Sequence, residues 1–511
     1  MRIMMKKTLL AFSLFIMVLI SAYGQKRYLE PVFSGVSKNT VIYGHNFHVL
    51  YVPVTGHTAL QPLVADVYQP DGDTETARPL ILYFHSGNFL PFPQNQSVSG
   101  TRSDSTIVEM SRRLAKMGYV VASCDYRLGW NPVAPEQADR VSTLINAAYR
   151  GVQDARTAVR YFKANAGTFG IDTSKIVLWG QGTGGYITLA TSTLDSYTKV
   201  VTTTNPEGKF VAANGFPMVI EQINGNIWGT SFGIIPVGLG LPLEGDTLCI
   251  PNNVGPSSNF QLCVNMGGAL GDISWLDANT PPIISFQTTT DPFAPYHDDV
   301  LIVPGPNLPV VQVQGSYEVQ KSAHNLGINK AFADKTFIDP LSQYVSTIND
   351  GFEGLYPIFR ANPYDSSPWD YWDRATNPND ASGILTNPDM SFAKASLFMD
   401  TIINYFAPRS CLVLNLGCDL TDYVSSTKTI SAEVAGVSAS PNPAGDFVII
   451  KSENKKIHGI VLYDGNGRTL TAIPNIMNKE YRLERNNIPP GVYYAQVRFE
   501  KESATVKFIF N

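Results

Sequence analysis

The sequence has little charge and little histidine for its length. Of its 511 residues, 38 are Lys or Arg, 43 are Asp or Glu, and 7 are His. The formal net charge of −5 leaves no basic excess of the kind that nucleic-acid binding requires, so we expect no nucleic-acid partner. The composition and motifs give no reason to expect a cofactor or a metal ion. The length exceeds that of an ordinary single domain, which predicts at least two.

Long apolar runs are absent beyond the first 24 residues. Arg2, Lys6 and Lys7 precede an apolar run over residues 9–20, and small residues follow it. This order is typical of a secretory signal peptide over residues 1–24, cleaved near residues 24–25. A membrane anchor is the alternative, but a spanning helix needs about 20 apolar residues. We therefore expect export, and no transmembrane segment in the mature chain.

Cysteine is also scarce, with 5 residues in the chain. Export permits disulfides, and two couples are close in sequence: Cys249 with Cys263, and Cys411 with Cys418. The spacing predicts local pairing within each couple. Cys124 ends an apolar run and is expected to be a small buried residue, the alternative being a reactive thiol.

Short apolar runs alternate with amphipathic stretches between residues 63 and 409. The runs cover residues 63–68, 80–85, 119–123, 176–179, 210–213 and 283–286, and helical spacing is found near 107–117 and 152–162. This alternation predicts an α/β domain over 25–409, with a mostly parallel sheet covered by helices on both faces. Two irregular insertions, at about 225–258 and 339–388, are expected to be either lids over a site or surface decoration.

The C-terminal part has a different pattern. Residues 410–436 lack periodicity and predict a linker, whereas residues 437–511 contain short alternating strands separated by Gly- and Pro-rich turns. This pattern predicts a small all-β domain, a sandwich.

The sequence K-I-V-L-W-G-Q-G-T-G-G-Y over residues 175–186 has the order of a strand, a tight turn and a helix. It matches the nucleophile elbow G-x-S-x-G, except that Gly182 stands where the serine is required. Glycine can neither attack a carbonyl nor hold an acyl group. A residue with a Cβ is strained in an elbow by about 1–3 kcal/mol, so glycine stabilises the fold once catalysis is lost.

Two further segments resemble the site of lipases and carboxylesterases. The sequence H-S-G-N over residues 85–88 follows an apolar run and is similar to their H-G-G-G motif. The resemblance implies an oxyanion hole made by the amides of Gly87, Asn88 and Thr183. Asp291 ends another apolar run and is followed by Pro and Tyr, as in the acid loop of the same family. The resemblance makes Asp291 the carboxylate that would orient a base.

The base itself is missing from its usual place. Chain order in this family is nucleophile, acid, histidine, and only His297, His324 and His458 follow Asp291. No histidine occurs between residues 337 and 390, where the family's histidine falls. His324 is the candidate base, with a solvent-facing helix residue as the alternative interpretation.

Taken together, residues 63–409 resemble the α/β-hydrolase superfamily, near its carboxylesterase and lipase branch. Three hypotheses follow, because fold alone does not decide function. The first is a secreted, inactive pseudo-hydrolase that binds an ester, lipid or glycan. The second is an active secreted ester hydrolase with a non-standard catalytic constellation, such as Asp291 with Glu353 assisting a water molecule. The third is a surface structural or adhesion protein that uses the fold as a scaffold.

The C-terminal domain resembles the sorting domain of cargo for the type IX secretion system of Bacteroidota. The resemblance rests on P-N-P-A at 441–444, L-Y-D-G-N-G-R at 462–468, I-P-P-G-V-Y at 488–493 and K-F-I-F at 507–510. It implies that the type IX machinery is a partner and that the mature protein is secreted or attached at the outer-membrane surface. A carbohydrate-binding or immunoglobulin-like module is the alternative.

Overall fold

The computed structural model describes residues 26–303, 305–425, 428–465, 469–500 and 502–511. The predicted signal peptide, 1–24, lies outside these residues. The chain divides into two compact units, one ending at Ala333 and resuming over Leu341–Asp419, the other holding Asp334–Pro340 and Leu420–Asn511. Each unit is described below by itself.

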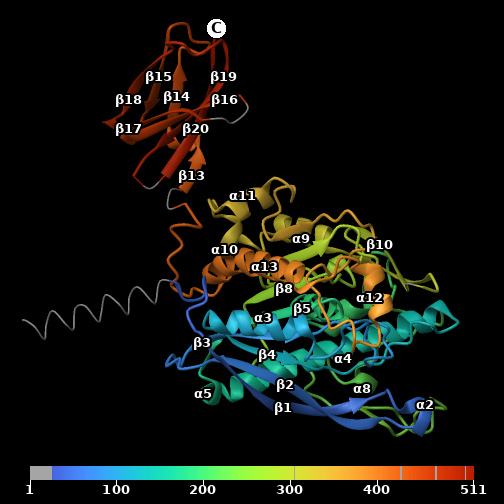
Figure 1. The fold of residues 1–511 in the computed structure, drawn as a ribbon. Coiled ribbons are helices and arrows are strands. Elements are labelled where there is room, and N and C mark those ends of the chain that lie inside the picture. Colours follow the sequence, from blue (N-terminus) through green and yellow to red (C-terminus); the bar gives the residue numbers. More distant parts are fainter. Residues whose placement is uncertain (1–25, 304, 426–427, 466–468, 501) are drawn as a thin grey trace, which may run out of the picture. The chain divides into compact units, whose positions relative to one another are not determined.

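The first unit is built on an eight-stranded sheet of order β1-β2-β4-β3-β5-β8-β9-β12 (Figure 1). The strands β1, β2 and β4 pair antiparallel, and all the other pairs are parallel. This is the mostly parallel sheet that the sequence predicts. The strand bounds are β1 Val36–His48, β2 Ala59–Pro70, β3 Arg78–Phe84, β4 Val120–Cys124, β5 Ile171–Gln181, β8 Leu262–Met266, β9 Ile283–Thr288 and β12 Leu355–Ile358.

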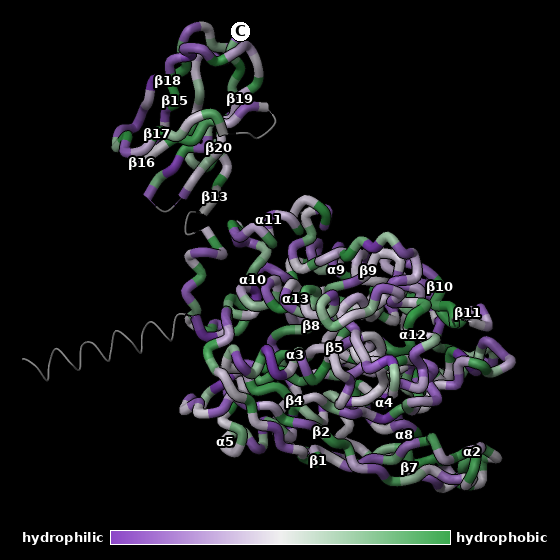
Figure 2. The backbone as a smooth tube through the Cα atoms, viewed as in Figure 1, coloured by the Kyte–Doolittle hydropathy of each residue, from purple (hydrophilic) through white to green (hydrophobic). Residues whose placement is uncertain are grey.

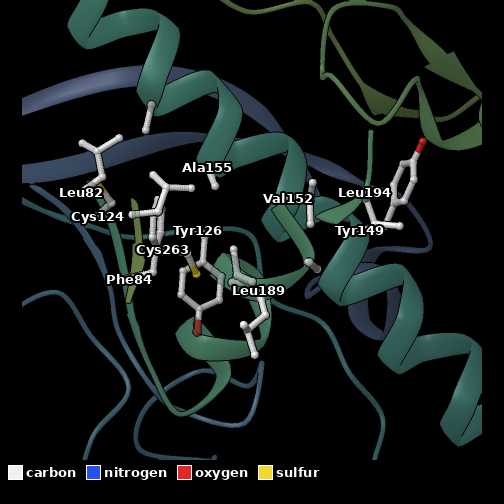
Figure 3. Packing of buried hydrophobic residues seen from close by; sticks show 14 of the residues in the cluster. Leu82, Phe84, Cys124, Tyr126, Tyr149, Val152, Ala155, Leu189, Leu194 and Cys263 are labelled. Atoms are coloured by element: carbon white, nitrogen blue, oxygen red, sulfur yellow. The ribbon is translucent and has the colours of Figure 1, made fainter. Parts of the chain in front are cut away.

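Helices supply the rest of the core. The long ones are α3 Ser105–Lys116, α4 Gln137–Ala164, α6 Thr183–Thr193, α9 Ser316–Leu326 and α13 Phe392–Val413. Helix α4 packs against α6, and α3 packs against α13. Leu82 and Phe84 of β3 belong to one buried hydrophobic cluster with Val152 and Ala155 of α4, part of which is drawn in Figure 3. Figure 2 shows β4 and β8 as largely hydrophobic stretches, in agreement with their complete burial.

The short elements lie mainly in the connections. The helices are α2 Val52–Thr55, α5 Ala166–Phe169, α7 Tyr197–Val201, α8 Glu221–Asn224, α10 Lys330–Ala333, α11 Pro340–Ser346 and α12 Asp380–Thr386, with a 3₁₀ turn at Ile273–Trp275. Two hairpins complete the unit: β6 Gly233–Ile234 with β7 Thr247–Cys249, and β10 Asp298–Val303 with β11 Leu308–Gln314.

Five of the six predicted strands are confirmed, and one is wrong. Residues 210–213 contribute only an isolated bridge at Val211. The pattern missed three strands: β1, a largely exposed edge strand, and β8 and β12, which are short and carry Asn265 and Pro357 in otherwise apolar runs. Proline is tolerated in β12 because this strand lies at the edge of the sheet.

A buried ion pair fixes α4 against the sheet. Arg127 follows β4 and Asp154 lies in α4, and both side chains are fully buried. The Arg127 Nε donates to Asp154 Oδ1 at 2.9 Å, and the Arg127 amide donates to Asp154 Oδ2 at 2.8 Å. Removing one partner of such a pair costs about 3–5 kcal/mol, because the other charge is left buried alone.

The two predicted disulfides have different outcomes. Cys411 and Cys418 form a disulfide at the end of α13, as predicted. The predicted Cys249–Cys263 pairing is wrong, because both are buried free thiols on different strands. Cys263 lies within the central strand β8, whereas Cys249 lies in β7 and accepts a hydrogen bond from Asn46 Nδ2 at 3.7 Å. Cys124 is a buried free thiol, as predicted, and burial raises its pKa well above the ordinary value.

The predicted linker is shorter in the structure. Helix α13 continues to Val413, and residues 428–435 belong to the C-terminal unit as β13 Lys428–Ser431 and α14 Ala432–Ala435. The pattern missed β13 because a single four-residue edge strand carries almost no periodic signal.

The C-terminal unit is the small all-β domain that the sequence predicts. Its sheets have the orders β13-β20-β19-β16-β17 and β14-β15-β18. One hydrophobic core includes side chains of both sheets, such as Ile450 and Leu462. The bounds are β14 Val437–Ser440, β15 Phe447–Ser452, β16 Ile457–Asp464, β17 Thr469–Asn478, β18 Glu480–Glu484, β19 Gly491–Arg498 and β20 Glu502–Phe510.

Candidate active site

The elbow turn is formed between β5 and α6. Gly182 has φ 55° and ψ −119°, a conformation that favours glycine, and its amide donates to Met266 O at 2.8 Å. A Cβ built on Gly182 would lie 2.9 Å from the Cβ of Ser86 and closer still to its Oγ. The backbone of the predicted elbow is therefore present, and the Ser86 side chain fills the space of the missing nucleophile.

The loop after β3 faces this elbow. The Tyr126 hydroxyl joins the two segments, with hydrogen bonds to His85 O at 2.8 Å and to Thr183 Oγ1 at 2.9 Å. In the described part of the chain, the amides of Gly87, Asn88 and Thr183 donate no hydrogen bond. Asn88 and Thr183 line the cavity described next, whereas Gly87 does not. An oxyanion hole needs unpaired amides of this kind near the elbow. That these three amides form one stays a prediction.

A cavity of about 590 Å³ lies over the elbow. Its walls come from the loop after β3, the segment after β4, the β10–β11 hairpin and the loops around α12. Val133 and Leu385 on its lining are exposed, so the cavity reaches the surface. The aromatic and aliphatic residues of the lining include Phe89, Leu90, Trp130, Pro132, Leu144, Tyr186, Phe293, Leu301, Ile302, Val303 and Trp372, and polar residues and glycines make up the rest of it. Among the described residues that line the cavity, none is Lys, Arg, His or Glu.

Asp291 lies in the cavity wall, in the turn after β9. Its Oδ1 accepts hydrogen bonds from the amides of Phe293, at 2.8 Å, and Ala294, at 3.4 Å. Burial, together with the nearby charge of Asp365, raises the pKa of Asp291 to about 8. An orienting carboxylate would be paired with an imidazole. Here the carboxyl group has neither an imidazole nor a cation as a hydrogen-bond partner in the described chain.

Asp370 is a second carboxyl group in the wall, and sequence reasoning missed it. It accepts a hydrogen bond from Gln181 Nε2 at 2.7 Å, directly before Gly182, and it is 7% exposed. Burial raises its pKa to about 6. Asp370 belongs to no recognisable motif in the sequence. Only the folded loop after β12 brings it back to the elbow.

His324 is not positioned near the elbow. It is exposed on α9, and its ring packs against Phe352 at 5.5 Å between centroids. His297 is exposed and lies 3.4 Å from Glu318, while His458 belongs to β16 of the second unit. None of the three lines the cavity. The solvent-facing interpretation of His324 therefore agrees with its place on the helix.

The predicted pair of Asp291 and Glu353 is wrong. Glu353 precedes β12, whereas Asp291 follows β9, and these strands are parallel neighbours with Leu355 opposite Ser285. The two carboxyl groups therefore lie at opposite ends of the strands. Glu353 Oε1 instead accepts hydrogen bonds from Arg409 Nε at 2.7 Å and from the Tyr405 hydroxyl at 3.1 Å.

The two predicted insertions differ in their relation to the cavity. None of the residues 225–258 lines it, so this segment is decoration with respect to the site. The segment 339–388 supplies Ser366, Asp370 and Leu385 to the wall, which fits the expectation of a lid. The same segment also contains β12, a strand of the central sheet. The β10–β11 hairpin, which carries no recognisable motif, was missed as part of the wall.

Two properties of the described residues concern metals and membranes. No group of three or more His, Cys, Asp or Glu in this part of the chain is arranged to hold a metal ion. None of its helices combines the length and apolar character that a membrane span requires.

A segment of each unit matches a known family model. Residues 65–216 match the BD-FAE family model, and residues 438–511 match the secretion system C-terminal sorting domain. The first match begins within β2, extends past α7 and includes the loop of Ser86 and the elbow. The second match indicates that the protein is secreted or at the cell surface.

Curated relatives include Secreted lipase 5 of Gibberella zeae, 29% identical over 213 residues, and Gut esterase 1 of Caenorhabditis elegans, 27% identical over 127 residues. The matches cover 40% and 24% of this chain. The chain spans 36% and 20% of the length of these two relatives.

Solved structures with similarity include esterase 2 of Thermogutta terrifontis. Its propionate-bound form is 17% identical, with 50% of this chain and 74% of that chain covered and a TM-score of 0.28. Its native form is 16% identical, with 54% and 78% covered and a TM-score of 0.28.

Proposed function

We propose that this secreted protein, an esterase-like α/β-hydrolase domain followed by a type IX sorting domain, binds an ester, lipid or glycan and does not hydrolyse it. The observation that carries the proposal is the composition of the cavity. Its elbow position is Gly182, and no histidine lies in its wall.

Repeated acyl transfer needs a nucleophile, a base that takes its proton, and a water activated by the same base. Besides hydroxyl groups such as that of Ser86, the cavity offers unpaired amides and two carboxyl groups with raised pKa values, and its described lining has no histidine to act as the base. A site reduced to an oxyanion hole and substrate binding retains about 10³–10⁴-fold acceleration over water. Turnover at an enzymic rate is therefore not expected.

The size and lining of the cavity support ligand binding over a purely structural role. Small-molecule sites are about 300–1,000 Å³, mostly apolar, and contain a few convergent polar groups. This cavity has about 590 Å³, and its lining combines aromatic and aliphatic residues with polar ones, among them Ser86, Asp291 and Asp370. A scaffold used only for adhesion would not need to keep such a cavity open.

Steady-state hydrolysis of p-nitrophenyl acetate and p-nitrophenyl butyrate tests the proposal. We expect continuous release of p-nitrophenol no faster than the oxyanion-hole level, about 10³–10⁴ over water. An Asp291→Asn variant purified in the same way is the control for contaminating esterase, whose activity this substitution cannot change. Sustained turnover above that level, lost in the variant, would overturn the proposal.

A further inference from the structure

Ser86 brings a hydroxyl group to the place where the elbow nucleophile would project. Its Cβ lies 2.9 Å from the position of a Cβ on Gly182, and its Oγ lies closer. Both Ser86 and Gly182 line the cavity. The serine occupies the second position of H-S-G-N, where the resembling motif has glycine. Relative to that motif, serine and glycine have exchanged places between the two loops.

The Ser86 hydroxyl is available to a ligand. Its Oγ takes part in none of the hydrogen bonds found among the described residues, whereas its own carbonyl oxygen is engaged. The Ser86 carbonyl lies 2.5 Å from His85 Nδ1 and accepts from the Tyr126 hydroxyl at 3.4 Å. The neighbouring hydroxyl of Thr183 is engaged with Tyr126 at 2.9 Å. Of these two hydroxyl groups beside the elbow, Ser86 is therefore the free one.

We propose that Ser86 is an acyl-accepting residue that captures activated esters covalently. Its Oγ attacks the carbonyl carbon while the ester oxygen points to the amides of Asn88 and Thr183. The new Oγ–C bond forms, the C–O bond to the leaving group breaks, and the leaving group departs as an alkoxide or phenolate. The hydroxyl proton passes to water in the open cavity, since no histidine in its wall can accept it.

The reaction stops at the acylated serine. This part of the inference rests on the proposed absence of turnover, because deacylation needs a base that activates water. His85 cannot supply one: it is buried, its Nδ1 faces the Ser86 carbonyl, and its Nε2 lies 3.6 Å from Asp125 Oδ1. Acylation without a base is slow and requires a good leaving group, so p-nitrophenyl esters are suitable probes.

Intact-mass and peptide mass spectrometry after incubation with p-nitrophenyl acetate test the proposal. We expect one equivalent of p-nitrophenol per protein, one added acetyl group, and its location on the peptide that contains Ser86. Ser86→Ala and Ser86→Gly should each lose this adduct. Ser103→Ala, an exposed serine outside the cavity, is the matched control and should keep it. Circular dichroism establishes that each variant is folded.

The possible results separate this inference from the proposed function. Unchanged labelling in both folded Ser86 variants, or no labelling of the wild-type protein, would overturn the role of Ser86 and leave the absence of turnover standing. Continuous p-nitrophenol release that both Ser86 variants abolish would support Ser86 as the acceptor and overturn the absence of turnover. An adduct mapped to Thr183 or Ser366 would contradict the assignment of the free hydroxyl to Ser86.

Discussion

The Ser86 side chain occupies the space that a side chain on Gly182 would need. A side chain on Gly182 would begin 2.9 Å from Ser86 Cβ, a distance too short for two carbon atoms that are not bonded. Gly182 also has a positive φ of 55°. The two positions therefore constrain each other: serine at position 86 is compatible with glycine at 182 and unfavourable with any larger residue there.

Gly182→Ser should accordingly destabilise the fold and fail to restore turnover. We expect a loss of about 2–4 kcal/mol from backbone strain and overpacking. Adding Ser86→Gly should recover about 1–3 kcal/mol of it, because the space is then free. Urea unfolding of the two single variants and the double variant gives the coupling energy. Strictly additive effects would show that the two side chains do not compete.

The same variants test whether a base reaches the elbow. Neither Gly182→Ser nor the double variant should show an esterase burst followed by turnover, because no histidine lines the cavity. Stopped-flow release of p-nitrophenol measures this. Restored turnover would mean that a histidine, with His324 the first candidate, moves to the elbow in solution.

Asp291 should make stability fall as pH rises. Its pKa is about 8 in the folded protein, whereas an unfolded aspartate titrates near about 3.9. Between these values the folded state binds the proton more tightly, so raising the pH removes stability. Asp291→Asn cannot ionise, so its stability relative to wild type should rise between pH 4 and pH 8, by up to about 5 kcal/mol for a shift of this size. Urea unfolding at both pH values measures the difference; an equal difference at the two would contradict the raised pKa.

The cysteines should react according to their burial. Native protein should show no rapid thiol reaction, because Cys124, Cys249 and Cys263 are buried. Unfolded, unreduced protein should show these three thiols and retain the Cys411–Cys418 bond. Thiol titration with and without denaturant measures both. A count of one thiol in the unfolded protein would mean that Cys249 and Cys263 are paired, contrary to the structure.

Replacing both Cys411 and Cys418 by serine should lower the free energy of unfolding by about 2 kcal/mol, because the loop that the disulfide closes is short.

The C-terminal domain should determine the destination of the protein. In a bacterium with a type IX system, removal of residues 437–511 should leave the protein in the periplasm. Cell fractionation and surface labelling measure its location. Unchanged delivery to the surface or medium would contradict the sorting role. A full-length variant in which only Cys411 and Cys418 are replaced is the control. Its first domain is altered but its C-terminal domain is intact, so its delivery should be unchanged.

Local patterns were sufficient to predict the architecture. The alternation of runs and amphipathic helices predicted five strands of the sheet, and the glycines around Gly182 predicted the elbow. These signals are carried by neighbouring residues, so they survive without tertiary information. Three strands were not predicted. β1 is a largely exposed edge strand without an apolar run, and in β8 and β12 Asn265 and Pro357 interrupt short apolar runs, so that their places in the sheet depend on tertiary packing.

The candidate site was less predictable because its parts are distant in sequence. The loop of Ser86 and the elbow meet only after β3 and β5 pair, so the conflict between Ser86 and Gly182 has no local signal. Asp370 reaches Gln181 through a loop without periodicity. Glu353 was misplaced because only the parallel register of β9 and β12 reveals which end of the strand it occupies.

Binding without turnover is tested most directly by following an unactivated ester and the protein in one NMR sample. Ethyl 3-phenylpropionate has an aromatic body that fits the cavity walls and a leaving group too poor for acylation without a base. Binding without turnover predicts saturation transfer from the protein to the phenyl protons, with the ethyl resonances unchanged over time. Growth of free ethanol that depends on the protein and exceeds the oxyanion-hole level would contradict it, as would the absence of any saturation transfer from this ester and from lipid or glycan probes.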